Sequence, residues 1–214
     1  MKIRYDETLG RWVSTEIYSD NSFGYGRFIF YVASRVDGLD SNAVLGLFIY
    51  SDDRSGVMGG YKEIDIEFSR WGYPESQNVW YTVWSAYSFP SHESYGFSLS
   101  LSNRVSMHYF EWSEGSVEFA SMQGRYGRTL NSWEKIEGWT YTGADIPGPP
   151  AHVHINLWLI DNPSGLNEPY GDGELEVIIE RFEYLPNAQL SHPSIDLRDR
   201  IPLGGGLGEL HGSL

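Results

Sequence analysis

One stretch constrains the fold of this chain more than any other. Residues 63–68 read Glu-Ile-Asp-Ile-Glu-Phe, so that carboxylates alternate with large apolar side chains. A period of two is typical of a β-strand with one face in the core and the other face outside. We therefore expect Ile64, Ile66 and Phe68 to pack inward and the three acids to lie in a row on the opposite face.

Three carboxylates in one row are costly, because like charges on neighbouring positions raise one another's pKa. An ordinary solvated strand face is the alternative, but such a face would mix Lys or Thr into the row. Four residues of strand span ~13 Å. Long Glu63 and Glu67 side chains that lean together can approach the ~5–5.5 Å gap of a retaining glycosidase pair. The shorter Asp65 fits between them, which suggests a nucleophile, an acid/base and a tuning residue.

The remaining pattern predicts an all-β chain. No long segment has the 3.6-residue period of a helix, whereas short alternating segments and turn signals recur throughout. We expect strands at 11–19 and 23–33 on either side of a turn at Asn21-Ser22, and further strands at 97–101 and 173–185. At 214 residues, the chain is long enough for one all-β domain.

That domain is expected to span residues 1–186. Beyond it, residues 187–214 are rich in Pro and Gly, which predicts an extended tail or linker. The same residues have the alternative of lying along an open edge of a sheet.

Charge and composition restrict the partners. The net charge of −14 argues against nucleic acid and anionic membranes, and it favours a neutral glucan over a sulfated or uronic-acid polymer. Aromatic residues make up 15% of the chain and include eight Trp, which suits stacking on sugars. Without Cys, no disulfide can form. No apolar run reaches membrane-spanning length, and the first residues do not resemble a signal peptide.

Two further segments carry candidate cleft residues. In 79–84, alternation places Trp80, Thr82 and Trp84 on one face, which faces either the core or a cleft. In 152–159, it places two His, Asn156 and Trp158 on one face. The paired His have the spacing of metal ligands, but no third ligand is evident, so we expect them to line a polar cleft.

The motif at 63–68 resembles the active-site motif of glycoside hydrolase family 16, the lichenase and laminarinase group. The resemblance extends over roughly residues 12–186. Four flanking segments also resemble family strands, in the same order along the chain: 23–28, 47–50, 109–112 and 155–158.

This resemblance implies a fold and a set of roles. The fold is a two-sheet antiparallel jelly-roll sandwich of the concanavalin A-like kind. Glu63 is the nucleophile, Asp65 assists it, and Glu67 is the general acid/base. The residues that contact substrate are Tyr61, Thr82, Trp84, Asn156 and Trp158. No cofactor is implied, apart from a structural calcium ion that some relatives hold with an acid at the position of Glu180.

The expected function is that of a retaining endo-acting hydrolase on a neutral β-glucan with β-1,3 or mixed β-1,3/1,4 linkages. Glu63 must be ionised, and the charges of Glu63 and Asp65 should raise the pKa of Glu67 so that it can donate a proton. A transglycosylase and a non-catalytic carbohydrate-binding protein on the same fold are the alternatives. By the family resemblance we expect a monomer that works outside the cell or at its surface.

Overall fold

The structure is a computed structural model that describes residues 1–51, 62–84, 92–124, 134–143, 145–161, 167–171, 173–187 and 210–213. Within these residues the chain forms 15 β-strands and one short 3₁₀ helix, η1 (Val36–Gly38). All paired strands run antiparallel. The prediction of an all-β chain is therefore confirmed over the described residues.

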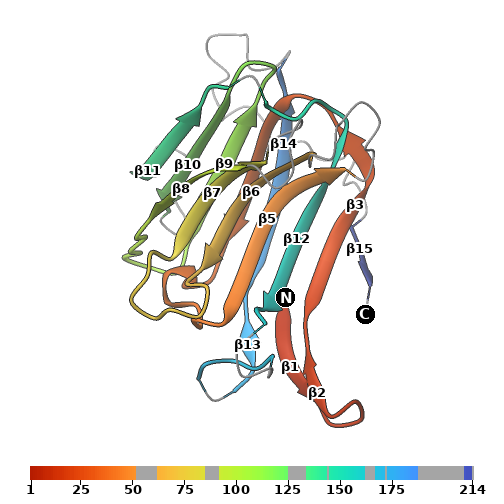
Figure 1. The fold of residues 1–214 in the computed structure, drawn as a ribbon, viewed down its shortest axis with the longest axis vertical. Coiled ribbons are helices and arrows are strands. Elements are labelled where there is room, and N and C mark those ends of the chain that lie inside the picture. The colour runs from red at the N-terminus through yellow and green to blue at the C-terminus, as the bar shows by residue number, and fades with distance from the viewer. Residues whose placement is uncertain are drawn as a thin grey trace.

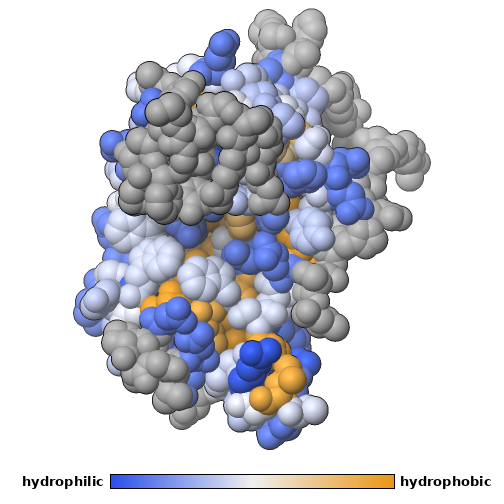
Figure 2. Space-filling model, turned by 45° about the vertical axis from the view of Figure 1, so that its right-hand side comes forward, coloured by the Kyte–Doolittle hydropathy of each residue, from blue (hydrophilic) through white to orange (hydrophobic). Residues whose placement is uncertain are grey.

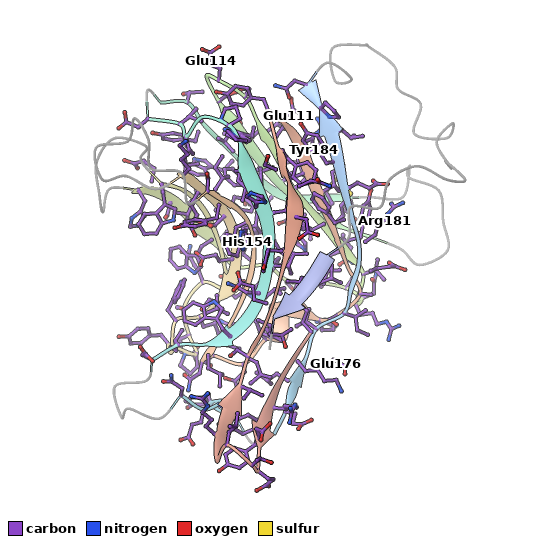
Figure 3. The ribbon with its side chains drawn as sticks, turned by 90° about the vertical axis from the view of Figure 1, so that its right-hand side faces the viewer. Glu111, Glu114, His154, Glu176, Arg181 and Tyr184 are labelled. Atoms are coloured by element: carbon purple, nitrogen blue, oxygen red, sulfur yellow. The ribbon has the colours of Figure 1, made fainter. Side chains whose placement is uncertain are left out.

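Two large sheets form the sandwich (Figure 1). The seven-stranded sheet has the order β15 (Leu210–Ser213), β3 (Thr15–Phe23), β12 (Ala151–Leu159), β5 (Ala43–Ser51), β6 (Lys62–Ser69), β7 (Val79–Trp84) and β8 (His92–Phe97). The five-stranded sheet has the order β11 (Glu134–Tyr141), β10 (Val117–Gln123), β9 (Ser106–Trp112), β4 (Gly26–Val32) and β14 (Ile179–Pro186). Figure 3 shows the layers from the side, with His154 on β12 in one layer and Arg181 and Tyr184 on β14 in the other.

The core lies between these sheets. Ile64, Ile66 and Phe68 of β6 are fully buried there, as their alternation predicts. Burial of each such side chain contributes about 1.5–3 kcal/mol, which fixes the register of β6 because a one-residue slip would expose all three. Tyr81 of β7 stacks on Phe119 of β10 with ring centroids 4.8 Å apart, so aromatic contacts join the two sheets.

A third, small sheet contains β13 (Leu175–Glu176), β1 (Lys2–Asp6) and β2 (Arg11–Val13). The turn between β1 and β2 ends at Gly10, whose φ of 63° lies in the left-handed region that glycine adopts at no steric cost. In Figure 1 this hairpin extends below the two large sheets.

Three local predictions are wrong. Asn21 and Ser22 are not a turn, because β3 continues to Phe23, which pairs with Ala151. The expected strand at 97–101 ends at Phe97. Beyond it, the side chain of Asn78 takes the place of a partner strand: its Oδ1 accepts from the Leu99 N–H at 2.7 Å, and its Nδ2 donates to the Leu99 carbonyl at 3.0 Å.

The third wrong prediction is a continuous strand over 173–185. The chain leaves the small sheet after Glu176 and enters the five-stranded sheet at Ile179. Between them, the N–H of Ile178 donates to Ser34 Oγ at 2.9 Å instead of to a ladder partner. The side-chain bond therefore marks the crossing from one sheet to the other.

The C-terminal segment contributes β15, which pairs with β3 at the edge of the seven-stranded sheet, with Leu210 opposite Ser19. Most of residues 187–214 lies outside the described residues, so the boundary at residue 186 stays a prediction. Among the described residues, no helix has the length and apolar character needed to cross a membrane. Figure 2 shows a face covered mainly by hydrophilic residues and residues of intermediate hydropathy, with hydrophobic patches between them.

Candidate active site

The predicted acid row lies on β6, near the middle of the seven-stranded sheet. Glu63 and Glu67 are half-buried and Asp65 is only 3% exposed. Since Ile64, Ile66 and Phe68 point into the core, the three acids occupy the sheet face that is turned away from the five-stranded sheet. The sheet therefore brings together the three residues that the sequence singled out.

Asp65 is held from two sides. Its side chain is hydrogen-bonded to that of Glu63. From β7, Trp84 Nε1 donates to Asp65 Oδ2 at 2.9 Å. This arrangement fixes the short acid beneath its longer neighbour, as a residue that positions Glu63 would require.

Burial governs the proton affinity of the row. It is the main cause that raises the pKa of Glu63 to about 7, while the hydrogen bond with Asp65 acts in the opposite direction. Burial also raises the pKa of Asp65, and the charges of Glu63 and Glu67 and the hydrogen bond to Glu63 raise it further. That bond thus favours the charged form of Glu63 and disfavours the charged form of Asp65.

The pKa of Glu67 is raised to about 7, first by burial and then by the charge of Glu63. We expected the charges of both neighbouring acids to be the cause. The structure corrects this: desolvation is the larger effect, and the charge that adds to it is that of Glu63.

Because the pKa values of Glu63 and Glu67 are raised, we expect the fold to lose stability as the pH rises from 4.5 to 7. In that interval an unfolded chain has released the proton of a Glu with its usual pKa near 4.5, whereas the folded chain keeps it up to about 7. Each carboxyl should therefore lower the free energy of unfolding by about 1–3 kcal/mol across the interval. Urea unfolding at pH 5 and pH 7 measures this loss.

Glu67→Gln should show a clearly smaller loss, because the amide has no proton to release. Glu75→Gln, at an exposed position on the same connection between β6 and β7, serves as the control and should behave like the unmodified protein. An equal loss in the Glu67→Gln variant and the unmodified protein would contradict the account.

Cross-strand neighbours shape the surroundings of Glu67. It pairs with Gly46 on β5 and with Trp80 on β7. A Cβ on Gly46 would lie 2.5 Å from Asn156 Oδ1, which shows that the Asn156 side chain lies over this glycine. The Gly46 N–H donates to the same Oδ1 at 3.1 Å. Because Gly46 has no side chain, the side-chain amide of Asn156 on β12 can lie beside Glu67.

Trp80 borders Glu67 on the other side. A Cβ on its partner Gly96 would lie 2.6 Å from Trp80 Cζ3, so the indole lies over that glycine of β8. Trp80 Nε1 donates to the carbonyl of Ser69 at 3.1 Å, which holds the ring in place. Trp80 was not predicted to bind substrate, although its alternation with Thr82 and Trp84 placed it on the same face.

The other predicted substrate contacts have different positions. Trp84 is half-buried beside the acids, where it contacts His92 with ring centroids 4.6 Å apart. Thr82 is 4% exposed, and its Oγ1 lies 3.0 Å from Ser94 Oγ. Trp158 is half-buried on β12, and Tyr61 lies outside the described residues. Contact of these residues with a substrate stays a prediction.

The two His of β12 have separate partners. His152 Nδ1 lies 2.8 Å from the carbonyl of Ser19, and His154 Nδ1 lies 2.9 Å from Glu16 Oε1. The His154 ring also stacks on Phe48, at a centroid distance of 5.0 Å. No group of three or more His, Asp or Glu in the described part of the chain is placed to hold a metal ion. Calcium at Glu180 stays a prediction.

Comparison with known proteins shows the fold. No protein-family model and no curated protein matches the chain. Solved structures do match, among them a β-1,3-1,4-glucanase (lichenase) derived from a mouse hindgut metagenome. It is 19% identical with a TM-score of 0.59, and the match covers 86% of this chain and 78% of the lichenase.

Two other solved structures illustrate the range of these relatives. A glycoside hydrolase family 16 endo-glucanase from Bacteroides ovatus, in complex with G4G3G-2F-DNP, is 12% identical with a TM-score of 0.52, over 86% of this chain and 84% of that one. A Mycobacterium tuberculosis protein called an immunostimulatory antigen and pseudo β-1,3-glucanase is 15% identical with a TM-score of 0.61, over 87% and 73%. The chain thus has the jelly-roll fold of family 16 structures, which confirms the predicted architecture.

Proposed function

We propose that this protein is a retaining endo-acting glycoside hydrolase whose substrate is a neutral β-glucan with β-1,3 or mixed β-1,3/1,4 linkages. One observation carries the proposal: three acids lie in a row on one face of β6, and burial raises the pKa of Glu67 to about 7. Such a value suits a group that must donate and accept a proton near neutral pH.

In the first step, the Glu63 carboxylate attacks the anomeric carbon while Glu67 gives its proton to the departing glycosidic oxygen. The bond between that carbon and that oxygen breaks, and the leaving sugar departs as an alcohol. The hydrogen bond between Asp65 and Glu63 lowers the pKa of Glu63 and so favours the charged form that the nucleophile needs.

In the second step, Glu63 is esterified and carries no charge. The charge that raised the pKa of Glu67 is then absent, so Glu67 stays ionised once it has given up its proton and can act as the base toward water. The water oxygen attacks the anomeric carbon, the ester bond breaks, and Glu63 leaves as a carboxylate. Both carboxyls regain their initial protonation, and the configuration at the anomeric carbon is retained.

Further observations support a neutral carbohydrate ligand. Trp80 and Trp84 flank the acid row and offer apolar ring surface, and the net charge of −14 disfavours sulfated and acidic polymers. The Bacteroides ovatus endo-glucanase of the same fold is in complex with an oligosaccharide derivative. For this chain we also propose a monomer that works outside the cell or at its surface.

The proposal is tested by incubation with barley β-glucan, laminarin, agarose and carrageenan side by side. Release of reducing ends from barley β-glucan or laminarin, with oligosaccharides of several lengths early in the reaction, is the expected result. Activity on agarose or carrageenan alone would contradict the assignment of a neutral glucan.

A carbohydrate-binding protein without turnover is the second candidate, because one structure of the same fold is called a pseudo β-1,3-glucanase. Binding of glucan oligosaccharides with no reducing ends released over days would favour it. Transglycosylation follows the same two steps with a sugar in place of water, and product chains longer than the substrate would reveal it.

A further inference from the structure

The connection between β6 and β7 contains a tryptophan in an unusual backbone conformation. Trp71 has a φ of 52°, and it is the one non-glycine residue with a positive φ in the described part of the chain. A left-handed conformation brings the Cβ of an L-residue close to the backbone, and bulky residues rarely adopt it. Such strain persists where the surroundings enforce it, often at a functional site.

The surroundings of Trp71 do enforce this conformation. Its N–H donates to Ser69 Oγ at 3.0 Å, and the N–H of Gly72 donates to the carbonyl of Ser41 at 2.8 Å. Arg70 closes the connection, since its Nη1 donates to the carbonyls of Pro74 at 2.9 Å and Ser76 at 2.6 Å. The indole is therefore presented on a rigid support.

The indole borders the acid row at its Glu67 end. Its ring makes an edge contact with Trp158, with centroids 6.3 Å apart and an interplanar angle of 64°. Trp158 of β12 and Ser69 of β6 both pair with Val44 of β5. Ser69 is the residue that follows Glu67 on the same face of β6, so the contact lies just beyond the Glu67 end of the acid row. Figure 1 shows the connection from β6 to β7 at the lower end of the sandwich, near the end of β12.

We propose that Trp71 forms the wall of a sugar-binding subsite at the Glu67 end of the acid row, where it stacks on a gluco-configured pyranosyl unit. This rests on the proposed function, since it takes the sugar to be part of the same substrate. A β-glucosyl ring has equatorial hydroxyls and presents apolar C–H groups on its faces, which an indole face can cover. A half-buried indole that keeps part of its surface accessible is suited to this role.

The backbone conformation makes a sharp test possible. Glycine adopts a positive φ without cost and asparagine tolerates it, so Trp71→Gly and Trp71→Asn remove the indole without adding backbone strain. Both variants should keep a Tm within about 4 °C of the parent protein. Both should bind cellotetraose or laminaritetraose about 10-fold more weakly, as expected when one aromatic stacking contact is lost.

Binding is measured by calorimetry with Glu63→Ala in every protein, so that no substrate is consumed. The control is Tyr73→Ala, which removes a ring that is 72% exposed on the same connection and should leave the affinity unchanged. Equal affinities of the parent and both Trp71 variants would overturn the subsite, as would the absence of tetrasaccharide binding by the parent.

These outcomes are separable from those of the proposed function. Hydrolysis of glucan by the unmodified protein, together with unchanged binding in the Trp71 variants, would refute the subsite and leave the hydrolase intact. Weaker binding in the Trp71 variants, together with an unmodified protein that releases no reducing ends, would support the subsite and refute the hydrolase.

Discussion

Glu63→Ala should lose glucan hydrolysis by on the order of 10⁴-fold or more, because no covalent intermediate can form without the nucleophile. The loss should be the same on polymers and on activated aryl glycosides, since both require attack on the anomeric carbon. Initial rates of reducing-end release and of aryl alcohol release measure it. The variant should be no less stable than the unmodified protein at pH 7, because it removes a buried carboxyl.

A gain-of-function control accompanies this loss. An α-glycosyl fluoride has the configuration of the missing covalent intermediate, so the Glu63→Ala protein should turn it over with inversion while Glu67 acts as the base. More than about 1% residual activity on glucan would be incompatible with a nucleophilic role of Glu63.

Glu67→Ala should distinguish substrates according to their leaving groups. Hydrolysis of glucan should fall by roughly 10²–10⁴-fold, because the departing sugar hydroxyl needs a proton. Formation of the intermediate from a β-aryl glycoside with a strongly acidic phenol should be nearly unaffected, because that leaving group departs as an anion. A burst of phenol release, followed by slow turnover, is the expected time course. Equal losses of burst rate and glucan hydrolysis would refute the role of proton donor.

The sequence predicts the acid row well because the apolar residues and the acids both recur there at every second position. Ile64, Ile66 and Phe68 must face the core, which leaves no freedom for the carboxylates between them. The structure agrees residue by residue. A strand buried on one face thus determines the direction of its side chains from local pattern alone.

Features that depend on partner strands are absent from such a pattern. That Asn156 lies over Gly46, beside Glu67, follows from the pairing of β12 with β5 and of β5 with β6. The sequence places these residues on strands but does not give the register that aligns them. For the same reason, the sequence places Trp80 on the same face as Thr82 and Trp84 but does not identify it as a neighbour of Glu67.

Side-chain hydrogen bonds and other tertiary contacts explain further differences between the predicted and the observed structure. Alternation from Phe97 to Leu101 indicated a strand, yet Asn78 takes up both backbone groups of Leu99. The left-handed backbone of Trp71 is likewise imposed by its surroundings and runs against the preference of the residue. The cause of the raised pKa of Glu67 also depends on tertiary structure, because burial exceeds the charge of its neighbours.

The configuration of the azide product formed by Glu67→Ala tests the assigned roles most directly. With azide and an activated β-aryl glucoside, Glu63 should first displace the phenol from the α face, and azide should then attack from the β face that water normally uses. The account predicts a β-glycosyl azide, identified by the coupling constant of its anomeric proton. An α-glycosyl azide would contradict it, because azide would then replace the nucleophile and the roles of Glu63 and Glu67 would be reversed.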